Sequence, residues 1–173
     1  MWCRIRQSLS RLVLVGSLIM LFLLGLESWS IPPATASIRQ TEEAPGQTLV
    51  QSRHTLRDKT GNAWQVVLFK RLKANDAISI NLRLVGFPGA AKFAHPQPLT
   101  MITETGTILS CKDMFAEKSP AANVGQYDFT NALNKLPTAA SVHLFPLMSD
   151  AQPIKLKIPP EVILEWQIVA ASK

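Results

Sequence analysis

Alternation of apolar and polar side chains is the feature of this sequence that most constrains its fold. The pattern is clearest over residues 78–84, in which every second residue is aliphatic: Ile78, Ile80, Leu82 and Leu84. Successive side chains of a β-strand point to opposite faces of the sheet, so one face of this segment is apolar and the other is polar. The segment is therefore predicted to be a half-buried strand.

Turn-forming residues separate further segments of this kind. Residues 58–62 join residues 49–57 to residues 63–71, and Gly61 within the turn can adopt a positive φ angle. This arrangement predicts a β-hairpin. Its second strand is apolar on both faces at its centre, which indicates a central, covered strand.

The whole pattern predicts a mainly β fold, an antiparallel β-sandwich or open barrel of about seven short strands. The predicted strands are residues 49–57, 63–71, 78–84, 99–103, 107–112, 141–148 and 154–158. Pro146 suggests that the strand over residues 141–148 lies at a sheet edge.

Two segments carry helix signals. A short helix is expected near residues 128–136, because Asp128 can cap it and Pro137 can end it. A C-terminal helix is possible near residues 160–171, where prolines precede Glu161, although apolar residues also alternate there as in a strand. The predicted organisation is a flexible N-terminal arm over residues 37–48 and a single β-rich domain over residues 49–173.

The N-terminus has the pattern of a signal peptide. Three basic residues precede an uncharged apolar run over residues 12–26: Arg4, Arg6 and Arg11. Small residues then occupy positions 34–36, which predicts cleavage between Ala36 and Ser37. An uncleaved membrane anchor is the alternative, but the apolar run is shorter than the roughly 20 residues that cross a bilayer. We expect an exported protein that meets the membrane only through its signal peptide.

The charge and cysteine content of the mature chain limit its chemistry. Three arginines and Glu27 leave with the signal peptide, so the net charge falls from +6 to +4. The remaining basic residues are dispersed, and the cluster of Lys70, Arg71 and Lys73 is interpreted as a solvated strand end, so no nucleic-acid partner is expected. Cys111 is the sole cysteine left after cleavage, which excludes an intrachain disulfide.

Candidate catalytic residues are few. Cys111 could act as a nucleophile with His95 or His143 as its base and Asp113 as an orienting group, if the fold brings them together. The alternative is a buried structural cysteine, because the strand pattern places Cys111 on the same face as Leu109.

A metal or cofactor site is not predicted. The chain has three histidines, His54, His95 and His143, and they lack the spacing of paired metal ligands. The sequence also contains no phosphate-binding glycine loop.

Two other features bear on binding. The large aromatic residues are predicted to pack mainly in the core: Trp64, Phe69, Tyr127 and Trp166. The proline- and glycine-rich residues 86–98 form the longest predicted connection, and this loop is the expected position of a binding surface.

Several segments resemble a family of exported cyanobacterial proteins that is a domain of unknown function. They are EAPGQ at 43–47, residues 52–71 with the core LRDKTGNAWQVVLFK, LRLVGFPG at 82–89, GQYD at 125–128 and EW at 165–166. The resemblance covers nearly the whole mature chain. It implies a periplasmic or thylakoid-lumen location and carries over no activity, cofactor or site.

These observations lead to one main functional hypothesis and two alternatives. The chain is interpreted as a non-enzymatic accessory or binding module with a protein partner in the periplasm or thylakoid lumen, because a complete fold pattern contains no catalytic grouping. The alternatives are an enzyme of unrecognised type that uses Cys111 with a histidine, and a metal-handling protein.

Overall fold

The computed structural model describes Val15, Ser17, Met20 and residues 38–172, except residues 74–78, 116, 118 and 151–153. The chain divides into two compact units, residues 1–35 and residues 36–173. In the first unit the three described residues are helical. The rest of the predicted signal peptide and its cleavage site lie outside the described residues.

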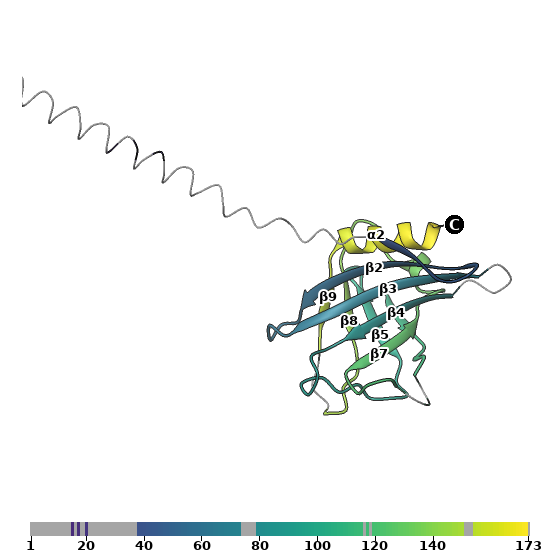
Figure 1. The fold of residues 1–173 in the computed structure, drawn as a ribbon. Helices are drawn as coiled ribbons and strands as arrows, with labels where there is room; N and C mark the ends of the chain where they lie inside the picture. Colours follow the sequence, from purple (N-terminus) through teal and green to yellow (C-terminus); the bar gives the residue numbers. More distant parts are fainter. Residues whose placement is uncertain are drawn as a thin grey trace, which may run out of the picture. The chain divides into compact units, whose positions relative to one another are not determined.

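The second unit is mainly β, as predicted, with nine described strands in two antiparallel sheets (Figure 1). The five-stranded sheet has the order β1-β2-β3-β4-β7: Arg39–Ala44, Gln47–Arg57, Ala63–Lys73, Ser79–Val85 and Val124–Asp128. The four-stranded sheet has the order β6-β5-β8-β9: Ile108–Cys111, Leu99–Thr103, Val142–Phe145 and Leu156–Ile158. Neither sheet closes into a barrel through its described strands.

The N-terminal edge of the larger sheet differs from the prediction. Residues 37–48 were expected to form a flexible arm, but β1 pairs with β2, and Arg39 lies opposite Gln51. Gly46 has a φ angle of 73°, which allows the tight turn between the two strands. All six residues of β1 are exposed. The polar composition of this segment therefore reflects an edge strand with two solvated faces.

The predicted hairpin over residues 49–71 is confirmed, and β2 and β3 pair along eleven residues each. The carboxylate of Asp58 organises the turn. It accepts hydrogen bonds from the backbone N–H groups of Thr60 at 2.8 Å and Asn62 at 3.0 Å, and from Nε1 of Trp64 at 3.0 Å. These bonds tie the turn to the core.

The strands predicted at residues 99–103 and 107–112 form a second hairpin, since β5 pairs with β6. Strand β8 lies between β5 and β9, so the expectation of an edge strand was wrong. The strand ends at Phe145, and Pro146 therefore takes no part in the sheet.

The segment expected to be a short helix near residues 128–136 contains a single 3-10 turn, η2, at Leu133–Lys135. Asp128 ends β7, and its carboxylate accepts the backbone N–H of Thr130 at 3.0 Å. The apolar residues of the segment are buried: Ala132, Leu133 and Leu136.

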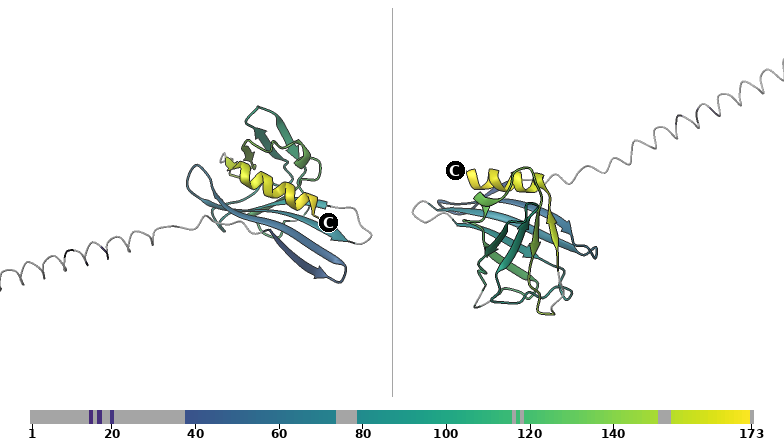
Figure 2. Two further views of the ribbon diagram at one scale, coloured as in Figure 1. Left: turned by 90° about the horizontal axis from the view of Figure 1, so that it is seen from above. Right: turned by 180° about the vertical axis from the view of Figure 1, so that it is seen from behind.

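The core lies between the inner faces of the two sheets and one side of helix α2, Pro160–Ala171 (Figure 2). The C-terminal segment is thus a helix, and its buried residues follow helical spacing: Val162, Ile163, Trp166 and Val169. Lys70 caps its C-terminal end, because Nζ donates to the carbonyl oxygens of Ala170 at 2.5 Å and Ser172 at 2.7 Å. None of the helices among the described residues has both the length and the apolar character needed to span a bilayer.

Candidate functional site

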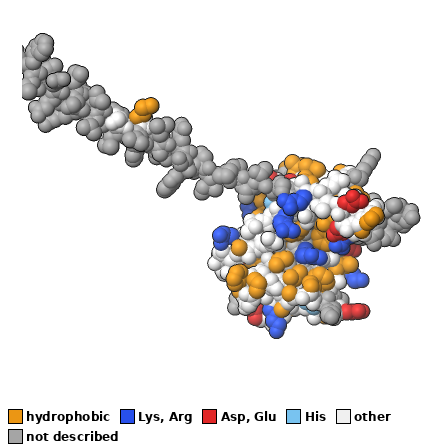
Figure 3. All heavy atoms as spheres, viewed as in Figure 1, with side chains coloured by type: hydrophobic (Ala, Val, Ile, Leu, Met, Phe, Trp, Pro, Cys, Tyr) orange, Lys and Arg blue, Asp and Glu red, His pale blue; other side chains and the backbone are white. Residues whose placement is uncertain are grey.

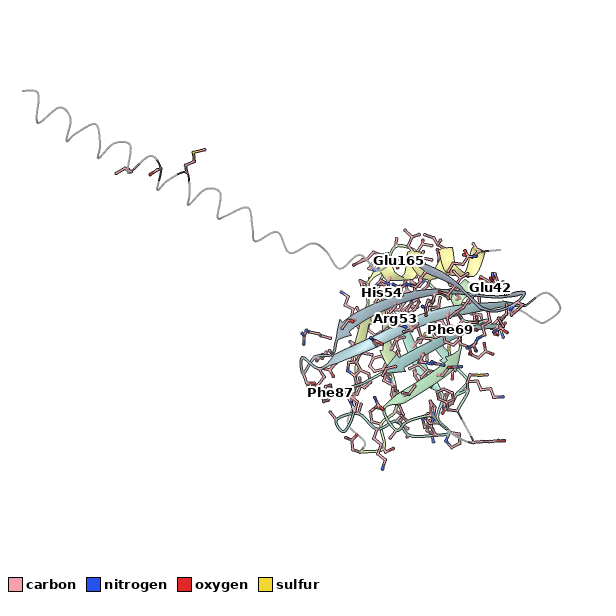
Figure 4. All side chains as sticks on the ribbon, in the orientation of Figure 1. Glu42, Arg53, His54, Phe69, Phe87 and Glu165 are labelled. Atoms are coloured by element: carbon pink, nitrogen blue, oxygen red, sulfur yellow. The ribbon has the colours of Figure 1, made fainter. Side chains whose placement is uncertain are left out.

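The outer face of the five-stranded sheet carries a hollow of about 190 Å³ lined by three arginines, which we call the arginine face. Arg53 comes from β2, Arg71 from β3 and Arg83 from β4, and Val67 and Phe69 lie between them. Figure 3 shows cationic and apolar side chains interspersed over these strands, and Figure 4 labels Arg53 and Phe69 there.

The strand register places these side chains together. Arg53 lies opposite Val67, and Val67 lies opposite Arg83, so one row crosses three strands. Directly opposed residues of antiparallel strands share a face. Arg39 lies opposite Gln51, a hollow-lining residue, and therefore belongs to the same face at its edge.

The guanidinium groups cover an aromatic ring. Arg71 and Arg83 lie 5.2 and 5.3 Å from the ring centre of Phe69, within the range of a cation–π interaction. Phe69 is only 4% exposed although it points away from the core. The prediction that the centre of β3 is covered on both faces is confirmed, and on this face arginine side chains provide the cover.

Two of the arginines are held in position. Oε1 of Gln126 accepts bonds from Nε of Arg83 at 3.1 Å and from its Nη2 at 2.7 Å. Oε2 of Glu43 accepts a bond from Nε of Arg71 at 3.0 Å, and this bond is the main cause of the lowered pKa of Glu43. Arg53 is exposed and forms no side-chain hydrogen bond or ion pair with a described residue.

The charge of the hollow is unbalanced. Three guanidinium groups and one carboxylate line it, which leaves a net charge of +2. Burial, followed by the charge of Arg71, lowers the pKa of Arg83. An anionic group would relieve the repulsion between these cations, so the face is suited to bind carboxylate or another oxyanion.

Sequence reasoning missed this face. Alternation along the sequence indicates that Phe69 and Arg71 share one face of their strand and that Arg83 lies on the polar face of another. The register between strands was needed to show that the three residues share one surface.

Cys111 lies in the core and is 2% exposed. Burial, together with the charge of Asp128, raises the pKa of its thiol to about 12. It forms no hydrogen bond with a histidine in the described part of the chain. This environment is that of a structural cysteine.

The structure brings together two of the other predicted candidates, His95 and Asp113. Nδ1 of His95 donates to Oδ2 of Asp113 at 2.6 Å, and the carboxylate also accepts the backbone N–H groups of Gln97 and Phe115. The side chain of Asp113 is 3% exposed. Nε2 of His95 is buried and has no hydrogen-bond partner among the described residues. The pair has the geometry of a base and its orienting group, but the nitrogen that would meet a substrate is covered.

His143 lies apart from the other candidates. It occupies β8 opposite Ile102 and Lys157, on the half-exposed face of the smaller sheet, whereas the neighbouring Leu144 points into the core. Burial, with the charges of Lys155 and Lys157, lowers its pKa. Cys111 points into the core, so the fold separates it from His143.

A second histidine cluster was not anticipated. Oε2 of Glu165 on α2 accepts bonds from Oγ of Ser52 and from Nε2 of His54, both at 3.0 Å, and the latter two atoms are also 3.0 Å apart (Figure 4). In a catalytic triad the carboxylate and the nucleophile meet different ring nitrogens. Here both meet Nε2, and Ser52 is fully buried. The cluster therefore ties β2 to α2.

The predicted binding loop, residues 86–98, borders a second hollow of about 230 Å³ that Trp64, Phe87 and Met148 help to line. Phe87 is 72% exposed. Backbone bonds fix the loop: Phe93 N–H donates to Ala122, and Ala94 N–H donates to Leu147. Within the described ranges, no group of three or more His, Cys, Asp and Glu residues is arranged to hold a metal ion.

Comparison with known proteins gives one match. A family model described as a protein of unknown function (DUF3122) matches residues 36–169. No curated protein and no solved structure matches the chain.

Proposed function

This chain belongs to the DUF3122 family of proteins of unknown function, and we propose that it is a non-enzymatic binding module whose arginine face docks onto an acidic surface of a protein partner. The observation that carries the proposal is the convergence of Arg53, Arg71 and Arg83 around Phe69, with one carboxylate among them.

The chemistry of the face favours a protein partner. Arginine and aromatic residues are enriched in protein interfaces, and a guanidinium group can bind a carboxylate through two parallel hydrogen bonds. Arg71 and Arg83 are already oriented by Glu43 and Gln126, so little side-chain freedom is lost when they bind. Arg53 is exposed and available to complete the contact.

The proposed location is the periplasm or the thylakoid lumen, after cleavage between Ala36 and Ser37. The basic and apolar segments of the N-terminus support export. The family match begins at residue 36, next to the proposed cleavage site, which is the expected start of a mature domain.

The surroundings of the catalytic candidates support a non-enzymatic role. The thiol of Cys111 is buried, and the free nitrogen of His95 is covered. An enzyme that used either group would have to expose it by a conformational change. Metal handling has no comparable support, since the three histidines occupy β2, the loop at residues 86–98 and β8.

A pull-down from an extract of the periplasm or the thylakoid lumen tests the proposal. The wild-type protein is expected to capture a stoichiometric partner that is released by high salt, because salt screens charges at an exposed surface. Arg53→Glu removes one cation and adds one anion, so the charge of the hollow falls from +2 to zero, and capture should fall at least tenfold.

Lys157→Glu is the matched control. Lys157 is exposed on β9 in the other sheet, and its substitution changes the net charge of the protein by the same amount. Equal loss of the partner with both variants would show that net charge alone matters. Undiminished capture by Arg53→Glu would refute docking through the arginine face.

A further inference from the structure

We propose that the free edge of β6 binds an extended, acidic peptide segment by adding it as a further strand to the smaller sheet. Strand β6, Ile108–Cys111, is the last strand in the order β6-β5-β8-β9. An edge strand presents unpaired backbone groups that a partner strand can use. This site is independent of the arginine face, which lies on the other sheet.

The register shows which backbone groups face outward. Thr103 N–H donates to the carbonyl of Thr107 at 3.0 Å, so residue 107 bonds toward β5. Backbone direction alternates along an antiparallel strand, and Ile108, Ser110 and Lys112 therefore direct their backbone groups away from β5. The carbonyl of Lys112 confirms this direction, because it accepts the N–H of Asp128 at 2.9 Å. The N–H and C=O groups of Ile108 and Ser110 remain for a peptide.

A groove of about 330 Å³ runs beside this edge. Ile108, Leu109, Ser110 and Lys112 form one side, and Asp128, Asn131, Ala132 and Lys135 form the other. Leu109 packs against the hydrophobic core and Ala132 belongs to it, so these two residues form the apolar floor of the groove. Alternate residues of an added strand would thus meet the apolar floor and the polar rim in turn.

The charges of the groove select an acidic segment. Lys112 and Lys135 are exposed at its rim and outnumber the single carboxylate of Asp128. The Oδ1 atom of that carboxylate is already bonded to the N–H of Thr130. An acidic residue on the rim side of the peptide would lie close to two ammonium groups.

Comparison with the edge at β1 supports the choice of β6. Charged residues and a register shift protect β1 from strand addition: Arg39, Glu42 and Glu43. The sequence Ile-Leu-Ser at 108–110 carries no such protection, and Ile108 is 68% exposed. An apolar residue at this position is suited to contact a side chain of the added strand.

The test uses protein purified from cells that express the full chain, and a phage-displayed library of random seven-residue peptides. Selected peptides are expected to alternate β-branched residues with Asp or Glu. Their affinity should fall at least tenfold for Ser110→Pro, which removes an outward N–H and leaves the bonds to β5 intact. Ser110→Ala keeps the N–H and should bind like wild type, and so should Arg53→Glu, whose site lies on the other sheet.

Peptide chemistry gives a second measurement that leaves the protein unchanged. Methylation of alternate backbone nitrogens of a selected peptide should abolish binding for one set of positions and spare the other, because successive N–H groups of a strand point in opposite directions. The proposal is overturned if the selection yields no alternating acidic peptide, if Ser110→Pro and Ser110→Ala bind equally, or if both methylation patterns have the same effect. Loss of binding with Arg53→Glu would reassign the peptides to the arginine face.

Discussion

The thiol of Cys111 should be almost unreactive in the folded protein, and its labelling rate separates the binding module from a thiol enzyme. Burial and the nearby charge of Asp128 raise the pKa of this thiol from 9.0 to about 12. The thiolate is the reactive form, so at pH 7 its population is about a thousandfold lower than that of an ordinary cysteine. The 2% exposure of the residue slows access further.

Iodoacetamide labelling followed by mass spectrometry of the peptide that contains Cys111 measures this rate without interference from Cys3. We expect a rate in folded protein at pH 7 that is at least a thousandfold below the rate in urea. A folded rate within tenfold of the unfolded rate would show an accessible thiolate and refute the reasoning. That result would restore Cys111 as a candidate nucleophile.

Two further predictions concern residues that hold the structure in place. Burial alone would raise the pKa of Asp58, but five hydrogen bonds to its carboxylate outweigh burial and lower the pKa from 3.8 to about 2. The ionised carboxylate therefore stabilises the fold by about 2 kcal/mol above pH 4, and this contribution is lost as the pH falls through 2. Between pH 5 and pH 2 the free energy of unfolding in urea should fall by about 2 kcal/mol more for wild type than for Asp58→Asn. Equal falls in the two proteins would contradict this role of Asp58. Gln126→Ala frees Arg83 without changing the charge, and it should weaken partner capture several-fold in a pull-down, whereas Arg53→Glu should lower capture at least tenfold. Unchanged capture by Gln126→Ala would show that the orientation of Arg83 is unimportant.

Local signals predicted much of the fold. The turn at residues 58–62 and the alternation around it specified the β2–β3 hairpin, because both depend on neighbours in the sequence. Pro160 and Glu161 likewise indicated the start of α2. The alternation of apolar residues in the same segment was misleading, because two of its members, Leu164 and Ile168, lie on the exposed side of the helix and are 52% and 50% exposed.

Polar edge elements were harder to predict. Strand β1 has no apolar face, and its sequence resembles a flexible arm. Its pairing with β2 depends on backbone bonds and on the turn at Gly46, which composition does not reveal. The helix predicted near residues 128–136 was too long for a related reason, because the apolar spacing of one turn cannot fix the length of a helix, and the structure has only the 3-10 turn Leu133–Lys135.

The candidate site depended on contacts that are distant in sequence. His95 and Asp113 were proposed as partners and do pair, although a buried nitrogen limits their chemistry. Arg53, Arg71 and Arg83 were not recognised as a group, because they are distant in the sequence and Arg71 was interpreted as part of a solvated strand end with Lys70 and Lys73. Only the register of β2, β3 and β4 shows that Arg53 and Arg83 share the row of Val67 and that Arg71 lies two rows away on the same face, beyond Phe69.

Lys70 and Arg71 illustrate why the centre of this sheet is a suitable place for a charged binding surface. They are adjacent in β3 and point to opposite faces, so the sequence cluster is divided by the sheet. Lys70 binds the C-terminal carbonyls of α2, whereas Arg71 joins the arginine face. Recognition of an acidic surface needs cations at fixed separations, and Arg53 and Arg83 stand two strand spacings apart, about 10 Å between their Cα atoms. A central strand anchored on both sides by hydrogen bonds holds that separation better than a surface loop does, which favours β2–β4 over residues 86–98 as the docking site.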